Sequence, residues 1–322
     1  MISLQSAIAF KEIISSHSKV MIISHERPDG DSVSSLLSLR ELICSINSAE
    51  VTLVSSNGVP KAFRFLPGAQ NILSDFLCGD FDLVVTVDCG DLRRTGFAGR
   101  ISKMLDNKVA LVNVDHHPKN DLHKLSTLNI FDSSAASATE IIYQLINKLK
   151  VQINPNLATM LYTGLFTDTG SFQHPVTTSG VLKAASELLA SGAKFKELRQ
   201  NLTYNKSLPM LKLWGLVLER IKINKYNFAV SVVTKEDMEK IGANEDDLAG
   251  VVNLLESIPE CCAAMLLVEV EPNVIRGSLR SNKSKIDVSG IAKLLDGGGH
   301  PRAAGFTYNG YVKMDKDGWK VL

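Results

Sequence analysis

Val112-Asn113-Val114-Asp115-His116-His117 is the stretch around which the chain is organised. An apolar run with β-branched valines is typical of a strand buried in a sheet. Such a strand would deliver one carboxylate and two imidazoles at its carboxyl end. Adjacent histidines on an extended backbone point to different sides, so we expect one to bind a metal and the other to face a substrate. Taken alone, the triplet is equally compatible with a loop that carries two solvated histidines.

The chain is long enough for about two domains of ~150 residues each. Its 322 residues are 45% hydrophobic and carry a net charge of +1, so no strong overall field draws it to nucleic acid or to an anionic membrane. The five cysteines form no Cys-x-x-Cys pair, which favours free thiols in a reducing cytoplasm. No apolar run approaches the ~18 residues of a membrane-spanning helix. Residues 1–18 predict an amphipathic helix with Leu4, Ile8 and Ile14 on one side, and not a signal peptide.

The first part of the chain alternates strands and helices, the pattern of a mostly parallel α/β sheet flanked by helices. Between them, residues 61–79 predict an irregular, partly helical connection. Ligands of such sheets bind beyond the carboxyl ends of the strands, where His25, Asp88 and Asp115 fall. The predicted strands are residues 19–24, 51–54, 83–87 and 109–114, and the predicted helices are residues 1–18, 32–47, 97–105, 137–149, 155–166 and 177–191.

We expect a first domain of residues 1–192, a helical linker of residues 193–220 and a second, smaller α/β domain of residues 221–322. Gly192 is the expected end of the first domain's last helix, because glycine commonly follows a helix. The linker predicts helices at 195–202 and 208–220. In the second domain the predicted strands are residues 223, 228–233, 263–269, 274–280 and 303–308, and the predicted helices are residues 249–258 and 287–295.

Acidic and imidazole side chains end several predicted elements of the first domain: His25, Asp29, Asp31, Asp88, Asp115, His116, His117 and Asp168. Each has an ordinary explanation. Asp29 and Asp31 flank the turn residue Gly30, and Asp88 could cap a helix. Asp168 is harder to explain, because a carboxylate near a helix C-terminus opposes the helix dipole. Four such clusters at the ends of neighbouring elements together favour one site.

These groups are oxygens and imidazoles without a thiolate, a set that suits Mn²⁺ or Mg²⁺ better than a structural zinc site. Asp29, Asp31, Asp88 and Asp168, packed together, would raise one another's pKa values, and two divalent ions would cancel their charges. Two such ions ~3.5–4 Å apart can create a bridging hydroxide and stabilise in-line attack at phosphorus. We therefore expect two Mn²⁺ ions, with Mg²⁺ as the substitute.

The second domain offers groups that could bind an anion. Gly297-Gly298-Gly299 permits the close approach of backbone N–H groups, and His300 and Arg302 follow it directly. Arg280-Ser281-Asn282-Lys283 ends a predicted strand and adds positive charge. The alternative is a glycine-rich turn between helix and strand, with solvated basic residues.

The clusters described above, taken in their order along the chain, resemble the motifs of the DHH/DHHA1 phosphoesterase family over essentially the whole chain. Ser34 stands where the family often has glycine, at a helix position away from the expected ligands. Within the family, the chain is similar to the short, two-domain nanoRNases, which also remove the 3′-phosphate from phosphoadenosine phosphate. The motifs are His25-x-x-Pro28-Asp29-Gly30-Asp31, Val87-Asp88, Asp115-His116-His117, Thr167-Asp168-Thr169-Gly170 and, in the second domain, Gly297-Gly298-Gly299-His300.

The resemblance implies a role for each residue. Asp88 would bridge two Mn²⁺ ions. Asp115 would orient a ligand histidine, and His117 would contact the scissile phosphate, so these two are the expected catalytic residues. The other ligands would be His25 and Asp29 for one ion, and Asp31, His116 and Asp168 for the other. The substrate would be bound by Arg280, Ser281, Gly298, Gly299, His300 and Arg302.

The implied function is that of a cytoplasmic phosphodiesterase and phosphatase acting on short RNA or DNA oligonucleotides, linear dinucleotides and phosphoadenosine phosphate. No membrane partner is expected, and a homodimer is left open. The first alternative is another hydrolase of this architecture: a cyclic-dinucleotide phosphodiesterase, a polyphosphatase or an inorganic pyrophosphatase. Residues 297–300 argue against the pyrophosphatase, which resembles the family only in its first domain. A non-catalytic nucleotide-binding protein would be expected to lack a metal ligand, and none is missing.

Overall fold

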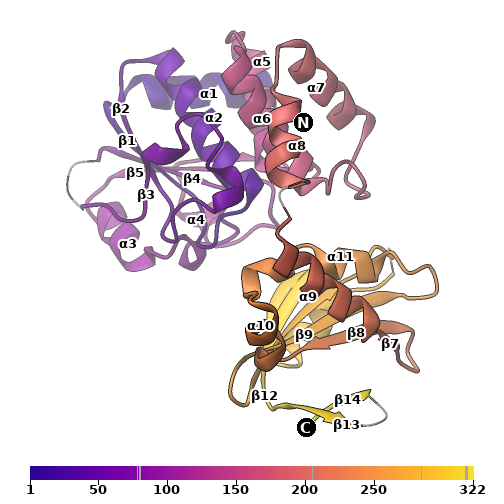
Figure 1. The fold of residues 1–322 in the computed structure, drawn as a ribbon. Coiled ribbons are helices and arrows are strands. Elements are labelled where there is room, and N and C mark those ends of the chain that lie inside the picture. Colours follow the sequence, from indigo (N-terminus) through magenta and orange to yellow (C-terminus); the bar gives the residue numbers. More distant parts are fainter. Residues whose placement is uncertain (78, 80, 205, 284, 316–317) are drawn as a thin grey trace. The chain divides into compact units, whose positions relative to one another are not determined.

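The structure is a computed structural model that describes residues 1–77, 79, 81–204, 206–283, 285–315 and 318–322 (Figure 1). The chain forms two compact units, residues 1–205 and residues 206–322. Both units are α/β, as the sequence predicts. Among the helices of the described residues, none has the length and apolar character needed to cross a membrane.

The first unit is built on a six-stranded sheet in the order β3-β2-β1-β4-β5-β6, in which every neighbouring pair is parallel. The sequence predicted the four inner strands and missed both edge strands, because β3 has two residues and β6 is short and interrupted by Asn129. The strands are β1 (Lys19–Ile23), β2 (Glu50–Val54), β3 (Ile72–Leu73), β4 (Leu83–Val87), β5 (Ala110–Asp115) and β6 (Leu128–Phe131).

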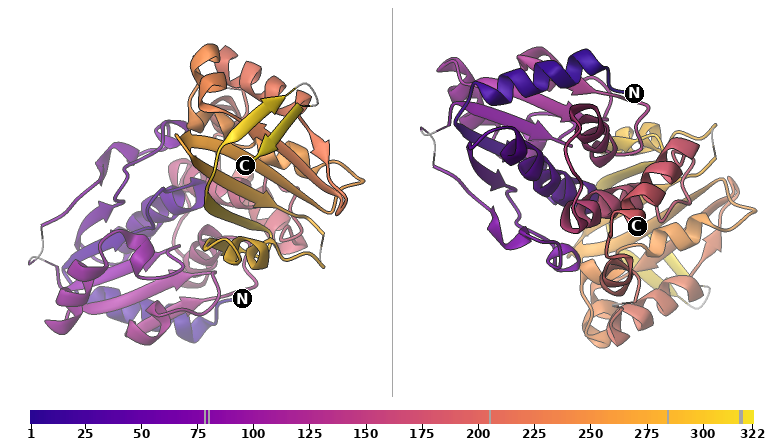
Figure 2. Two further views of the ribbon diagram at one scale, coloured as in Figure 1. Left: turned by 90° about the horizontal axis from the view of Figure 1, so that it is seen from below. Right: turned by 90° about the horizontal axis from the view of Figure 1, so that it is seen from above.

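Both faces of the central strands are buried, which explains why these strands are continuously apolar. Val20 and Ile22 of β1 pack into one core, and Met21 and Ile23 pack into a second core on the opposite face. Figure 2 gives two further views of the helices around this sheet. The larger core contains residues of α1 (Leu4–Ser15), α2 (Gly30–Ile46), α5 (Ala138–Leu149), α6 (Pro155–Asp168), α7 (Ser179–Ala190) and α8 (Phe195–Leu202). The smaller core contains residues of α3 (Ala98–Asp106) and α4 (Leu122–Leu125). Two 3₁₀ helices, η1 (Lys61–Phe63) and η2 (Ala69–Asn71), lie in the irregular connection.

The buried face of α1 differs from the predicted one. Ala7, Phe10 and Ile14 are buried, whereas Leu4 and Ile8 are 56% and 46% exposed. The prediction was wrong because Ile8 and Ile14 are six residues apart, or about 240° around a helix, and cannot share a face. Spacings of three and four residues, such as those of the buried set, do share one.

The second unit contains a six-stranded mixed sheet in the order β11-β12-β10-β9-β8-β7. Only the β8–β9 pair is parallel among the described strand pairs of this sheet. The strands are β7 (Lys222–Ile223), β8 (Phe228–Val233), β9 (Ala263–Glu271), β10 (Val274–Arg280), β11 (Gly298–His300) and β12 (Ala303–Asn309), and a separate hairpin pairs β13 (Val312–Asp315) with β14 (Gly318–Val321). The helices are α9 (Leu208–Glu219), α10 (Lys235–Ile241), α11 (Val251–Glu256) and α12 (Val288–Lys293), with the 3₁₀ helix η4 (Glu245–Leu248).

The division between the units falls within the stretch in which the sequence suggested a helical linker. Leu198 of α8 packs in the core of the first unit. Leu213 and Val217 of α9 pack in the second unit, against residues of β8 such as Ala229. Each of the two linker helices therefore belongs to the core of one unit.

Candidate metal centre

The predicted metal ligands gather at the carboxyl ends of three neighbouring strands. His25 and Asp29 follow β1, and Asp31 lies in the first turn of α2. Asp88 follows β4, and Asp115 ends β5 with His116 directly after it. Since β1, β4 and β5 are adjacent and parallel, these ends meet at one edge of the sheet. The last predicted ligand, Asp168, is the final residue of α6.

Two glycines allow α2 and α6 to approach one another, which brings the carboxylates of both helices together. A Cβ on Gly30 would lie 2.4 Å from the side chain of Thr167, beside Asp168. A Cβ on Gly164 would lie 2.3 Å from Thr139 Oγ1 of α5 and 2.8 Å from Asp31 Oδ1 of α2. A larger side chain at Gly30 would push α6 away from α2, and one at Gly164 would push α6 away from Thr139 and Asp31. Sequence patterns do not indicate this role for the two glycines, since a helix–helix contact is visible only in the tertiary structure.

The first ligand group consists of His25, Asp29 and Asp88, whose ligand atoms lie within 4.8 Å of one another. His25 Nε2 lies 3.6 Å from Asp88 Oδ2 and 3.9 Å from Asp29 Oδ2. The other ring nitrogen, Nδ1, lies 2.6 Å from the backbone carbonyl oxygen of Glu26. If Nδ1 donates to this carbonyl, Nε2 is left with its lone pair directed at the carboxylates, as in a metal-binding histidine.

The second ligand group consists of Asp31, His116 and Asp168. His116 Nε2 lies 3.6 Å from Asp168 Oδ2 and 3.5 Å from Asp88 Oδ1. Asp88 therefore presents one oxygen to His25 and the other to His116, so that its carboxylate stands between the two groups.

The carboxylate of Asp115 is buried and holds His117. Its Oδ1 accepts hydrogen bonds from the backbone N–H groups of His116 and His117, and it lies 2.8 Å from His117 Nδ1. Its Oδ2 accepts from the backbone N–H of Gly90. The resemblance assigned Asp115 to a ligand histidine, but the ring that it contacts belongs to the histidine expected to face the phosphate. The ring of His116 instead has Nδ1 3.3 Å from the carbonyl oxygen of Ala135.

Burial and like charges oppose ionisation of part of the cluster. Burial, with the nearby charge of Asp88, raises the pKa of Asp31 to about 7. Burial and the charge of Asp31 raise the pKa of Asp168 well above its usual range. Burial also acts to raise the pKa of Asp88, but its contacts with His116 and His25 outweigh burial and lower the pKa. Conversely, burial acts to lower the pKa of His25, and Asp88 overcomes it and raises the pKa to about 9.

The cluster therefore calls for positive charge, and its spacing fits a metal ion. The N···O separations of 3.5–3.9 Å exceed those of hydrogen bonds. Two ligands bound ~2.1 Å from one ion lie about 3 to 4 Å apart, which is the spacing found here. The donors are carboxylate oxygens and imidazole nitrogens, with no sulfur among them. Such a set suits Mn²⁺ and Mg²⁺, and the ions would replace the protons that otherwise neutralise the site.

The residues predicted to bind substrate lie in two parts of the second unit. Arg280 ends β10 and is half-buried, with Nη1 donating to the Leu279 carbonyl oxygen, and burial lowers its pKa. Ser281 is buried and donates to the carbonyl oxygen of Cys262. Arg302 donates to the backbone carbonyl oxygens of Lys283 and Ile286. His300 is exposed at the end of β11, with Nδ1 accepting from the Arg302 backbone N–H.

Two residues of the glycine run, Gly298 and Gly299, lie in the edge strand β11, and Gly297 directly precedes it. Gly298 and Gly299 of β11 pair with Gly305 and Ala304 of β12. A Cβ on Gly297 would lie 2.2 Å from the Gly305 carbonyl oxygen, and one on Gly299 would lie 2.5 Å from that of Ala303. The absence of side chains thus lets this strand lie close to β12. At Gly298, by contrast, a Cβ would meet no atom within 4 Å, so packing gives no reason for that glycine.

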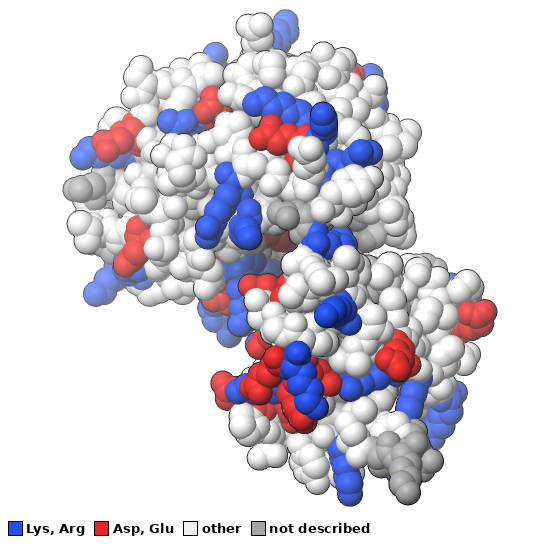
Figure 3. All heavy atoms as spheres, in the orientation of Figure 1, with Lys and Arg blue, Asp and Glu red and all other residues white. Residues whose placement is uncertain are grey.

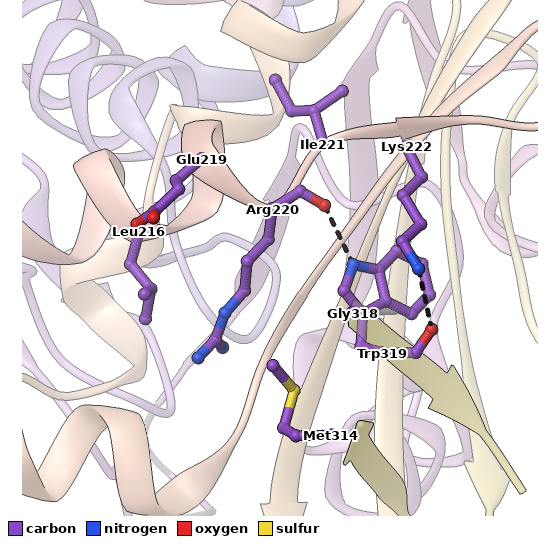
Figure 4. Close-up of a pocket in the computed structure, with 8 residues that line it drawn as sticks. All are labelled: Leu216, Glu219, Arg220, Ile221, Lys222, Met314, Gly318 and Trp319. Carbon is purple, nitrogen blue, oxygen red and sulfur yellow. Dashed lines mark hydrogen bonds between the residues drawn. The ribbon is translucent and has the colours of Figure 1, made fainter. Parts of the chain in front are cut away.

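A separate pocket of about 370 Å³ lies in the second unit, between the end of α9 and the β13–β14 hairpin (Figure 4). Trp319 forms one wall, with its indole N–H donating to the Arg220 carbonyl oxygen, and Lys222 lies over the indole ring. None of the site residues predicted from the sequence lines this pocket. Its lining residues are Leu216, Glu219, Arg220, Ile221, Lys222, Met314, Gly318 and Trp319.

Comparisons with known proteins agree with the motifs. The DHH family N-terminal domain matches residues 19–165, and the DHHA1 domain matches residues 225–316. The chain is 28% identical to the bifunctional oligoribonuclease and PAP phosphatase NrnA of Bacillus subtilis, over 94% of this chain and 93% of that protein. It is 30% identical to the protein of the same name from Mycoplasma genitalium, over 89% of this chain and 87% of that one.

A solved structure shares the whole fold. The exopolyphosphatase-related protein from Bacteroides fragilis superposes with a TM-score of 0.87 and 27% identity, covering 95% of this chain and 92% of that one. Two domain models matched in order and similarity along nearly the full length lead to one conclusion: the chain belongs to the DHH/DHHA1 phosphoesterase family.

Proposed function

We propose that this protein is a Mn²⁺-dependent phosphodiesterase and phosphatase that hydrolyses short oligoribonucleotides, linear dinucleotides and 3′-phosphoadenosine 5′-phosphate. The observation that carries the proposal is the position of Asp88 between His25 and His116, since a bridging carboxylate is what a two-ion centre requires. The names of the relatives supply the substrate class. A cytoplasmic location is part of the proposal, because Cys44, Cys89, Cys261 and Cys262 carry free thiols.

Each side chain then has a proposed task. His25, Asp29 and Asp88 would hold one ion, and Asp31, His116 and Asp168, together with Asp88, would hold the second. Bound there, the ions would lower the pKa of a water molecule and polarise the phosphoryl group. His117, fixed by Asp115, contacts the scissile phosphate. In the second unit, Arg280, Ser281, Gly298, Gly299, His300 and Arg302 remain the proposed substrate-binding set, with the backbone contributing at Ser281, whose hydroxyl is buried.

A second candidate is polyphosphate hydrolysis, which the name of the Bacteroides fragilis protein favours. The same ligands would serve, because a phosphoanhydride and a phosphodiester present similar oxygens to the ions. The difference would lie in the residues that hold the rest of the substrate.

The test is a hydrolysis panel with Mn²⁺, Mg²⁺ or excess EDTA. Its substrates are a dinucleotide, a five-nucleotide RNA, phosphoadenosine phosphate, polyphosphate, pyrophosphate and a cyclic dinucleotide. We expect the first three to be cleaved, fastest with Mn²⁺ and not at all in EDTA. Preferential cleavage of polyphosphate would select the second candidate. Full activity in EDTA would refute a metal-dependent mechanism of either kind.

A further inference from the structure

Arg94 places a guanidinium group beside the metal centre. Gly90, two residues after Asp88, has a φ of +67°, a conformation that favours glycine. A Cβ at this position would lie 2.9 Å from Arg94 Nη1 and 3.4 Å from His117 Cδ2. The guanidinium group and the imidazole ring are therefore neighbours on the same face of Gly90, and a side chain there would displace one or both.

The backbone around Arg94 is tied to the metal-ligand loops. Arg94 lies in the 3₁₀ helix η3 (Arg93–Thr95), and its backbone N–H donates to Asp91 Oδ1 at 3.0 Å. Its carbonyl oxygen accepts from the N–H of Glu26, next to His25. The same segment thus links the loop after β1 with the loop after β4. These hydrogen bonds fix the backbone position of Arg94, from which its side chain extends.

The charge of Arg94 is available for a ligand. Within the described part of the chain, no carboxylate forms an ion pair with this guanidinium, although Arg40, Arg100, Arg220 and Arg276 each pair with one. Its neighbour Arg93 is exposed, whereas Arg94 is only partly so. An arginine held against an acidic site without a carboxylate partner is suited to an incoming anion, and its planar fork matches two phosphate oxygens.

We propose that Arg94 binds the non-reacting oxygens of the phosphate group that His117 contacts. This inference rests on the proposed function for its substrate class, a phosphomonoester or phosphodiester. It adds a phosphate-binding cation in the first unit, beyond the basic residues proposed in the second. The smallest substrates would then be held at their reacting phosphate by the first unit itself.

The test compares Arg94→Gln and Arg94→Lys with Arg93→Gln, which removes a neighbouring exposed charge. Thermal midpoints and Mn²⁺ binding, followed by the EPR signal of free Mn²⁺, check the fold and the metal site. Phosphate binding is read from the Mn²⁺-induced ³¹P relaxation of inorganic phosphate, and activity from kcat and KM on a dinucleotide. For Arg94→Gln we expect loss of the ³¹P effect and a fall in kcat/KM of about 10²-fold, with Mn²⁺ still bound. Arg94→Lys should recover part of both, and Arg93→Gln should match the parent.

Two outcomes overturn the inference. One is a folded Arg94→Gln variant that binds phosphate and turns over the dinucleotide as the parent does. The other is loss of Mn²⁺ or of the fold in both Arg94 variants, which would make the residue structural. Failure of the proposed function would give a different result. The parent would cleave no substrate of the panel, but protein-bound Mn²⁺ would still enhance the ³¹P relaxation of inorganic phosphate, and Arg94→Gln would remove that enhancement.

Discussion

Asp31 Oδ2 accepts a hydrogen bond of 2.6 Å from the backbone N–H of Ala138, at the first turn of α5. Oδ1 of the same carboxylate accepts from the backbone N–H of Thr139 at 3.0 Å and from its hydroxyl at 2.6 Å. N–H groups in the first turn of a helix have no partner within the helix, and the helix dipole favours negative charge there. Asp31 therefore supports the fold of the first unit as well as standing among the proposed metal ligands.

We predict that Asp31→Ala destabilises the protein even without metal. The substitution leaves the two buried backbone N–H groups without their acceptor, which should cost about 1–3 kcal/mol or more, and Asp31→Asn should cost less because one amide oxygen remains. Thermal unfolding in EDTA, followed by circular dichroism, measures the stability of each protein. We expect the parent to be the most stable, Asp31→Asn to be intermediate and Asp31→Ala to be the least stable. Glu12→Ala, on the exposed side of α1, is the control and should change stability by less than ~0.5 kcal/mol. Equal stability of parent and Asp31→Ala would contradict the capping role.

Asp88→Asn should abolish hydrolysis and preserve the fold. Asp88 has a φ of +54°, in the left-handed region that asparagine tolerates well, so the backbone can stay in place. Loss of the carboxylate charge between the two ligand groups should lower kcat/KM by at least ~10²–10³-fold. Kinetics and Mn²⁺ content of the folded variant check this, with the exposed Asp106→Asn as the control. If folded Asp88→Asn retained parental activity, the bridging assignment would be wrong.

Much of the site could be predicted because its residues follow strands. A continuous apolar run marks a strand covered on both faces, and parallel strands bring their carboxyl ends to one edge, so the sequence alone suffices to group Asp88 with Asp115. The sequence does not suffice to predict the hydrogen bonds that hold the carboxylates of the site in place. Thr139 and Ala138 are more than 100 residues from Asp31 in sequence, and no local pattern links them.

The glycine run shows a second limit of sequence patterns. Gly297-Gly298-Gly299 suggested backbone N–H groups that an anion could approach, and in the structure Gly297 and Gly299 also have a packing reason, the close approach of this segment to β12. Sequence alone does not distinguish a glycine needed for a ligand from one needed for a neighbouring strand, since both demand the absence of a side chain.

Acid should weaken the second unit through Asp237. Arg220 donates two hydrogen bonds to this carboxylate, and Thr234 donates two more. Burial acts to raise the pKa of Asp237, but the bond from Arg220 outweighs it and lowers the pKa. A carboxyl group whose pKa is lower in the folded state stabilises the fold above its unfolded pKa of ~3.9, and that contribution is lost as the pH falls through the folded pKa.

The expected result is that Asp237→Asn lowers the unfolding free energy of the second unit at pH 7 and that its difference from the parent shrinks below about pH 4. Both tryptophans, Trp214 and Trp319, lie in this unit, so urea unfolding followed by tryptophan fluorescence reports on it selectively. Asp246→Asn, at an exposed position, is the control. A difference that stays constant from pH 7 to pH 3 would mean that the charge of Asp237 contributes nothing.

The final prediction concerns substrate length. Four aspartates of the proposed ligand set balance two divalent ions, so an anionic substrate needs cations from elsewhere. The net charge is only +1, and both acidic and basic side chains are visible on the surface drawn in Figure 3, so the chain carries no large excess of positive charge for a long nucleic-acid strand. A long strand would gain little from such a surface, so hydrolysis should fall with chain length and be fastest at roughly two to five nucleotides.

Specificity should therefore depend on individual basic side chains of the second unit. His300→Ala and Arg280→Ala should raise KM for a dinucleotide, with both metals retained, because these residues are proposed to bind substrate and not the ions. Arg276→Ala, on the same strand as Arg280 but paired with Glu245, is the matched control and should leave KM unchanged. The test is to measure kinetics on a dinucleotide and on a twenty-four-mer, together with the metal content of each variant. Metal loss in His300→Ala would place that residue among the ligands, and faster cleavage of the long strand would indicate a processive nuclease.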